Sequence, residues 1–229
     1  HFLDLLLFKT AANLKAEVSR YYLNYLWWVI EPALLMAVFY VIFGVVLDMR
    51  TEHFAAFLLT GLTFWNWFNR TVSNASGSIL TGGRLMLQVD IPKAFFPLEV
   101  FFRDGFKHLF VVGLLLLFLV FYPTPVYATW LTLPLLLLVQ GAFVLAVSIF
   151  CAALVPFVPD LRYVISTAMT LLFFGSGIFF DIEGVVLPEH AHLLFLNPMA
   201  GLVKSYRDIL VYGQYPDWFY ILKVLLFSI

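Results

Sequence analysis

Apolar segments long enough to cross a lipid bilayer restrict the fold of this chain more than any other feature. Residues 98–121 and 128–155 are two such segments, and a helix needs about 20 residues at 1.5 Å each to span about 30 Å of hydrocarbon. Of all residues, 63% are hydrophobic and 12% are charged, which lies outside the range of ordinary globular domains. The sequence therefore predicts an all-α integral membrane protein.

The hydropathy pattern predicts one transmembrane domain over residues 1–229 with six spans. The expected spans are residues 25–47, 54–76, 98–121, 128–155, 163–180 and 218–229. Pro134 is expected to kink the fourth span. The chain starts without Met and stops inside the sixth span, so we expect a piece of a longer protein with both ends missing.

Three further segments are too polar to be spans. Residues 1–20 carry leucines at helical spacing and predict an amphipathic helix at the membrane interface, with a solvated terminal helix as the alternative. Residues 82–97 form a proline-punctuated connection between the second and third spans. Residues 181–214 predict an extracytoplasmic re-entrant pair of short helices, broken at Asn197 and Pro198. Asn197, Pro198 and Arg207 are the candidate gate residues of this segment.

The distribution of Lys and Arg predicts the orientation. A cytoplasmic N-terminus would place eight basic residues inside and three outside, which agrees with the positive-inside rule. The inner residues would be Lys9, Lys15, Arg20, Arg84, Lys93, Arg103, Lys107 and Arg162. The sequence thus favours a cytoplasmic N-terminus and a cytoplasmic position for residues 82–97.

Four motifs resemble one family in their order and spacing. They are YLWWVIEPALLMAVFYVIF, LQVDIPKAFFPLEV, PDLRYVI and LNPMAGLVKSYRDIL, and the resemblance that they carry extends over almost the whole chain. The chain resembles the type-2 ABC exporter permeases that move lipid-linked polysaccharides, such as O-antigen, capsule and teichoic-acid chains, out of bacteria. The resemblance implies a multi-pass protein of the bacterial cytoplasmic membrane.

The same resemblance implies the partners. It implies a homodimer of this chain with two ATP-binding cassette subunits, a lipid-linked glycan as substrate, surrounding membrane lipids and no nucleic acid. ATP and Mg²⁺ would bind to the partner subunit, and the loop at 82–97 would dock on it. Apolar anchors and polar rim groups suit such a contact, although a simple connector lying on headgroups is the alternative. The candidate coupling residues are Leu87, Asp90, Ile91, Pro92 and Lys93.

The sequence contains little that would support catalysis by this chain alone. It has no GxxxxGK[ST] motif for ATP and no HExxH motif for zinc, so we expect no catalytic residue, no metal site and no cofactor. A membrane-bound glycosyltransferase or acyltransferase remains an alternative, with Asp181, Glu183 and His190 as its acidic and histidine groups. An exporter of a drug or a lipid with the same fold is the second alternative.

The first two predicted spans carry the candidate substrate-pathway residues. Aromatic rings there could stack on sugar faces, or they could simply face lipid and the membrane interface. Glu31 lies deep enough to be a functional carboxylate, or it orients the first span through a basic partner. Arg70 belongs to a polar stripe and would contact carrier phosphates or join helices together. The candidates are Glu31, Tyr40, Trp65, Asn66, Trp67, Phe68 and Arg70.

Overall fold

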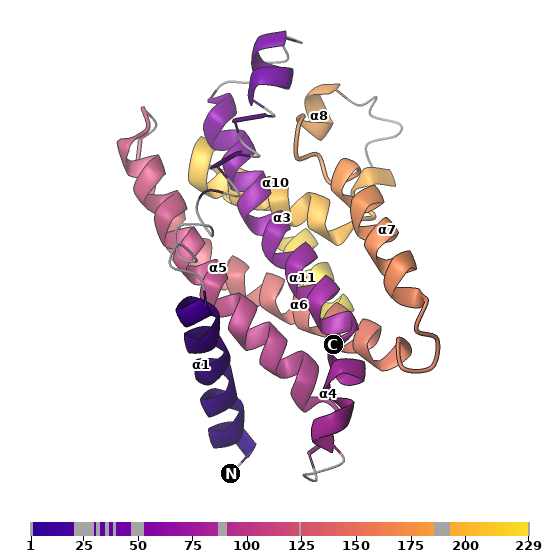
Figure 1. The fold of residues 1–229 in the computed structure, drawn as a ribbon. Helices are drawn as coiled ribbons and strands as arrows, with labels where there is room; N and C mark the ends of the chain where they lie inside the picture. Colours follow the sequence, from indigo (N-terminus) through magenta and orange to yellow (C-terminus); the bar gives the residue numbers. More distant parts are fainter. Residues whose placement is uncertain are drawn as a thin grey trace.

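The computed structural model describes residues 2–20, 30, 33–34, 37–38, 40–46, 53–86, 91–123, 125–185 and 193–228. Within these ranges every regular element is a helix (Figure 1). The helices are α1 (Phe2–Arg20), η1 (Tyr40–Val46), α3 (Phe54–Ser76), α4 (Ser78–Met86), α5 (Phe95–Phe121), η2 (Ala128–Thr132), α6 (Leu133–Leu154), α7 (Leu161–Phe174), α8 (Ile182–Val185), α10 (Pro198–Arg207), η3 (Asp208–Tyr212) and α11 (Trp218–Phe227).

Helix α3 is the centre of the bundle. It packs against α5, α6, α7 and α10, and most of its side chains are buried. A helix that is apolar around most of its circumference is stable only inside a larger structure or in lipid. Figure 1 shows α1 beside α5 at the edge of the bundle, and α4 following α3 at its lower end, where α4 contacts α5 and α6. Helix α3 therefore provides the common surface against which α5, α6, α7 and α10 pack.

Helix α5 and the run of η2 into α6 are long and apolar enough to cross a membrane, among the described residues. Helices α7 and α11 are apolar but shorter. Large apolar side chains on the outer faces of α5 and α6 are exposed, among them Phe106, Leu117 and Leu138. An apolar surface of this extent is typical of contact with lipid. The all-helical fold is compatible with the membrane protein that the sequence predicts.

The end of the fifth span and the effect of Pro134 differ from what the sequence predicts. The fifth span was expected over 163–180, but α7 ends at Phe174 and the chain then turns, with Gly177 at φ 64°. A residue without Cβ adopts that conformation without strain, so Gly177 allows the chain to turn here. Pro134 lies in the first turn of α6 and does not kink it, because its missing N–H would have no helical partner there.

The connection between the second and third spans is more helical than expected. Residues 82–86 belong to α4, and α5 begins at Phe95, three residues before the predicted start of the third span. Residues 91–94 form a turn, in which the backbone N–H of Phe95 donates to the carbonyl of Pro92 at 2.9 Å. Most of the first predicted span, residues 25–47, lies outside the described residues, and its described end at 40–46 is a π-helix.

Candidate functional site

Polar side chains of α3 and α5 face one another along one line of contact, which we call the α3–α5 polar seam: Asn66, Arg70, Asn74, Asp104 and Lys107. Asn74 Nδ2 donates to Asp104 Oδ2 at 2.8 Å, and Asp104 is buried. Arg103 Nε donates to Asp104 Oδ1 at 3.2 Å. The Asp104 carboxylate therefore receives one bond from each helix, and the seam joins α3 to α5.

Arg70 borders a small pocket in this seam. The pocket has a volume of about 40 Å³ and also contacts Asn66, Asp104, Lys107 and His108. Such a space holds water but is too small for a phosphate group. The predicted polar stripe of α3 thus faces α5 at Asn66 and Arg70. Whether Arg70 contacts a phosphate stays a prediction, and Glu31, which could pair with it, lies outside the described residues.

The base of α5 is tied to α1 by a second polar contact. Arg103 Nη1 lies 3.9 Å from Glu99 Oε1, an ion pair between side chains four residues apart on one face of α5. Asn13 Nδ2 donates to the same oxygen at 2.9 Å. Asp104 and His108 are also four residues apart, but no ion pair or hydrogen bond joins them in the described part of the chain. Asp104 is instead held by Arg103 and Asn74, as described above.

His108 instead stacks on Trp67. Their ring centroids are 4.4 Å apart with an interplanar angle of 10°, and both side chains are buried. Nothing in the sequence spacing indicated this contact, because Trp67 and His108 lie on different helices. It places one of the candidate pathway aromatics against α5.

The other candidate aromatics lie in the protein core. Trp65 is 1% exposed and contacts the ring of Phe173, and Phe68 is 2% exposed and contacts the ring of Phe143. In this conformation both rings are covered by protein. The side chain of Tyr40 is outside the described part of the chain. A role in the substrate pathway stays a prediction for all three.

The candidate coupling residues are described only in part. Pro92 and Lys93 are exposed in the turn before α5, and Ile91 is half-buried. Ile91 packs against a small apolar cluster of Leu6, Ile79, Phe95, Phe96 and Ala152. This cluster joins α1, α4, α5 and α6, so movement of the turn would reach four helices. Leu87 and Asp90 lie outside the described residues.

The break expected at Asn197 and Pro198 is the start of α10. Asn197 Oδ1 accepts the backbone N–H of Met199 at 3.1 Å, and Pro198 occupies the first turn, where its missing N–H has no cost. Asn197 Nδ2 also donates to Ser176 Oγ at 2.7 Å. The cap of α10 is therefore attached to the turn that follows α7.

Arg207 at the other end of α10 is attached to the same turn. Its Nη1 and Nη2 donate to the carbonyls of Gly177 at 2.7 Å and Ile178 at 2.8 Å, and its Nε donates to the carbonyl of Phe57 at 3.0 Å. The guanidinium carbon lies 3.4 Å from the centroid of the Phe57 ring. Gly61 leaves room for this group, because a Cβ there would lie 2.5 Å from Nη2. We call this arrangement the Arg207 lock.

Sequence reasoning selected Arg207 but could not name its partners. Every residue has a backbone carbonyl, so the residue types do not reveal which carbonyls accept from Arg207. In addition, the turn that supplies two of these carbonyls was expected to be helical. Gly61 and Gly177 were the available signal for this contact in the sequence, because a glycine lets another group pack close to the backbone. The described residues contain no group of three His, Cys, Asp or Glu suited to a metal ion.

The fold and these sites define a class: a helical membrane protein whose polar side chains join helices to one another. No family model matches the chain. Two O-antigen export system permease proteins RfbA from Klebsiella pneumoniae are 28% and 26% identical to it over 212 residues, which is 92% of this chain and 81% of each relative. An O-antigen export system permease protein RfbA from Myxococcus xanthus is 29% identical over 209 residues, 90% of this chain and 79% of the relative. These similarities confirm the resemblance to polysaccharide-export permeases stated from the sequence.

Proposed function

We propose that this chain is the membrane-spanning subunit of an ATP-driven ABC exporter that moves a lipid-linked polysaccharide across the bacterial cytoplasmic membrane. The observation that carries the proposal is the similarity to three O-antigen export permeases over at least 90% of the chain. The apolar helices α5 and α6 agree with a membrane subunit. The carried glycan is O-antigen-like, capsular or teichoic.

The energy comes from a partner in this proposal. The chain lacks a phosphate-binding loop, so ATP and Mg²⁺ bind to two separate ATP-binding cassette subunits. A homodimer of this chain supplies the two halves of the pathway. The exposed Pro92 and Lys93 and the cluster around Ile91 support docking at this turn, because the cluster links the turn to α1, α4, α5 and α6.

The proposed orientation has the N-terminus and this turn in the cytoplasm, as the excess of basic residues favours. Arg70 and Asn74, which lie in the C-terminal half of α3, are then in the cytoplasmic half of the membrane. For a carrier phosphate to reach Arg70, the 40 Å³ pocket must widen, which requires α3 and α5 to separate. The segment with Asn197, Pro198 and Arg207 would lie on the extracytoplasmic side and gate the exit.

Export by the reconstituted complex tests the proposal. The chain and its ATPase subunit are expressed in a bacterial strain that makes a polyprenyl-linked glycan but lacks its own exporter, and glycan on the cell surface is measured. We expect surface glycan only when both subunits are present. Transport by a stable monomer of this chain without an ATPase, or glycan transfer by the isolated chain, would contradict the proposal.

Substitutions in the turn test coupling in the same assay. Ile91→Asp places an unpaired charge against the apolar cluster that links the turn to four helices, and Lys93→Glu reverses an exposed charge in the proposed ATPase contact, so both should uncouple ATP hydrolysis from export. Val126→Asp is the control, because Val126 is an exposed apolar residue in the connection after α5. Normal export and normal ATPase stimulation in the Lys93→Glu variant would show that the turn is not part of the contact with the ATPase subunit.

A further inference from the structure

A polar cavity lies where the C-terminal end of α3, the beginning of α4 and the beginning of α7 meet. Its volume is about 320 Å³, compared with about 40 Å³ for the pocket beside Arg70. One water needs only about 10–15 Å³, so the cavity is large enough for a phosphate or a diphosphate group. The described residues that line it are Ser73, Asn74, Ser76, Gly77, Thr81, Arg162, Ile165 and Ser166. Arg162 carries the only charge among them, and the charge is positive.

Arg162 comes from the segment PDLRYVI and lies against the junction of α3 and α4. A Cβ added to Gly77 would lie 3.4 Å from Arg162 Cδ and 3.6 Å from Arg162 Nη1, so the arginine side chain packs over this glycine. The guanidinium forms no hydrogen bond or ion pair with another described residue. The side chain is also exposed, so its N–H donors are accessible to a ligand in the cavity.

Two neighbouring side chains add accessible donors. Ser166 lies one turn after Arg162 on α7, is exposed, and its hydroxyl has no partner among the described residues. Asn74 is exposed as well, and its amide gives one of two N–H groups to Asp104 and retains the other. Thr81 Oγ1, by contrast, already donates to a backbone carbonyl. A guanidinium, a hydroxyl and an amide without any carboxylate in the lining suit an anion with several acceptor oxygens, and phosphate is such an anion.

The surroundings of the cavity indicate which kind of phosphate would reach it. In the proposed orientation the connection between α6 and α7 is cytoplasmic, so the cavity lies at the cytoplasmic end of the bundle. Tyr163 and Phe174 are exposed and lie about three turns apart on one face of α7. An apolar surface therefore continues from the cavity along α7, and it suits the hydrocarbon chain of a lipid.

We propose that this cavity binds the phosphate of a membrane lipid, which in this exporter is the carrier of the glycan, with Arg162 and Ser166 donating to its oxygens. The inference rests on the proposed export of a lipid-linked glycan. The cavity is open in this conformation, whereas the pocket at Arg70 must widen before a phosphate can enter. Arg70 lies about two helical turns before Gly77, so a carrier phosphate would bind at Arg162 first.

Native mass spectrometry of the complex tests the site. The full chain with its ATPase subunit is titrated with undecaprenyl diphosphate, and the fraction of the complex that holds the lipid is measured. Arg162→Gln should weaken binding about tenfold, which corresponds to about 1.4 kcal/mol. Arg162→Lys keeps the charge but loses the planar fork, and it should weaken binding about threefold, as should Ser166→Ala. Unchanged binding in the Arg162→Gln variant would overturn the proposal and leave the cavity to water.

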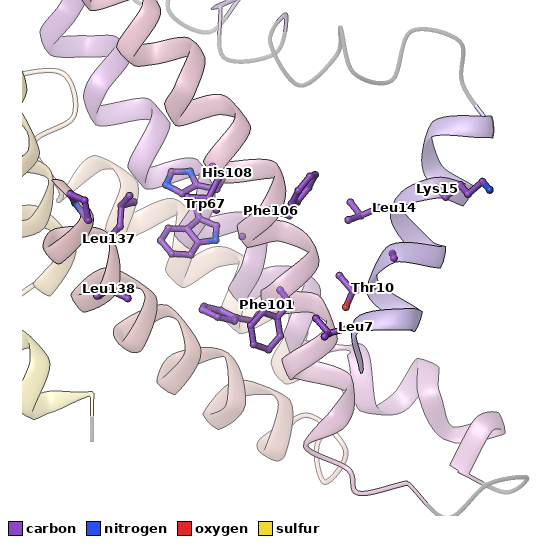
Figure 2. Close-up of a pocket in the computed structure, with 15 residues that line it drawn as sticks. Leu7, Thr10, Leu14, Lys15, Trp67, Phe101, Phe106, His108, Leu137 and Leu138 are labelled. Carbon is purple, nitrogen blue, oxygen red and sulfur yellow. The ribbon is translucent and has the colours of Figure 1, made fainter. Parts of the chain in front are cut away.

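Lys15→Gln is the matched control for the loss of one positive charge. Lys15 is exposed on α1, on the side proposed as cytoplasmic, and Figure 2 shows its side chain turned away from the bundle. Both residues are exposed, so neither change should disturb the fold. Lipid binding by Lys15→Gln should stay within about twofold of the unaltered complex. An equal loss in both variants would overturn the site, because net charge alone would then attract the lipid.

Two further ligands identify the source of the phosphate. Phosphatidylglycerol has a single phosphodiester, and inorganic phosphate has no hydrocarbon chain. We expect undecaprenyl diphosphate to bind about tenfold more tightly than phosphatidylglycerol, and an excess of inorganic phosphate not to displace it. Equal binding of phosphatidylglycerol, with the same loss in Arg162→Gln, would assign the cavity to bilayer phospholipid and overturn the carrier. Displacement by inorganic phosphate would overturn a lipid site altogether.

Export separates this inference from the proposed function. In the surface-glycan assay, Arg162→Gln should reduce the glycan on the cell surface, whereas Lys15→Gln should not. Normal surface glycan and unchanged lipid binding in Arg162→Gln would overturn the role of the cavity and leave the proposed function intact. If the unaltered chain with its ATPase subunit gives no surface glycan, the proposed function itself is contradicted.

Discussion

Arg207 and Arg70 are both arginines in an apolar bundle, but their surroundings differ. Arg207 is 5% exposed, and each of its three guanidinium nitrogens donates to a backbone carbonyl. Arg70 is half-buried at the edge of a pocket that contacts Asn66, Asp104 and Lys107. One arginine is enclosed by fixed backbone, whereas the other borders a space whose size depends on how α3 and α5 pack.

The difference separates a structural arginine from a candidate for substrate contact. A buried guanidinium is costly unless it is fully hydrogen-bonded, and the three carbonyls meet that requirement for Arg207 without any ligand. The group can therefore hold α10, α3 and the turn after α7 together. The pocket at Arg70 keeps a polar space open beside the guanidinium. An ionisable residue at membrane depth is a functional candidate by default, but its partners decide which kind of role it has.

Removing Arg207 should have the largest effect on stability. Arg207→Met keeps an unbranched side chain but leaves the carbonyls of Gly177 and Ile178 without its N–H donors. We expect a loss of about 3 kcal/mol, which is roughly 10 °C in the midpoint of thermal unfolding in detergent. Lys204→Met is the control, because Lys204 lies on the same helix and is half-buried. If the midpoint of thermal unfolding of Arg207→Met lies within about 2 °C of that of the unaltered protein, these hydrogen bonds contribute little to stability. That result would contradict the Arg207 lock.

Adding one methyl group at Gly61 should have the next largest effect. In most helix interiors Gly→Ala stabilises by up to about 1 kcal/mol. Here the new Cβ would lie 2.5 Å from Arg207 Nη2, and the three hydrogen bonds prevent the guanidinium from moving away. We expect Gly61→Ala to destabilise by about 1–2 kcal/mol. Gly113→Ala is the control and should be neutral or stabilising, because an added Cβ there meets nothing within 4 Å. A neutral or stabilising Gly61→Ala would show that the guanidinium of Arg207 can shift away at little cost.

Breaking the α3–α5 polar seam should have a smaller effect. Asn74→Ala removes the bond to Asp104, but Arg103 still donates to that carboxylate. Interhelical hydrogen bonds in membrane proteins contribute about 0.6 kcal/mol, so the shift in thermal midpoint should be about 2 °C. Asn69→Ala is the control on the same helix, where Asn69 contacts Ser73 of its own helix. A loss as large as that of Arg207→Met would make the seam a second structural lock.

Substituting Arg70 should have the smallest effect on stability and a clear effect on activity. We expect Arg70→Gln and Arg70→Lys to change the unfolding free energy by less than about 0.5 kcal/mol. Stimulation of the ATPase by the lipid-linked glycan should fall in both variants, and further with Gln, because Lys keeps the charge but loses the planar fork. Loss of assembly in both variants would instead place Arg70 with Arg207 as a structural residue.

Several features were predictable because they depend on residues close together in the sequence. The start of α10 follows from an Asn cap before Pro, and the pair of Glu99 with Arg103 follows from helical spacing. The helical spacing of the leucines in residues 1–20 indicated an amphipathic helix, and Leu7 and Leu14 do lie on one side of α1, toward α5 and α6. Among the side chains of α1 that the structure describes, residues 5–15, Leu6 and Thr10 are buried against the bundle. The pattern thus gave the period of the helix but not the angle at which it packs.

Composition and hydropathy alone determined that this chain is helical and belongs in a membrane, because those properties sum over many residues and tolerate local error. Motif order alone indicated the polysaccharide-export permeases, which the similar proteins confirm. The tertiary structure decided which polar groups meet. Arg207 pairs with backbone carbonyls of distant segments, Trp67 stacks on His108, and Asp104 takes Asn74 in place of the nearer His108. Such contacts depend on the packing angles of helices, and no spacing within one helix contains that information.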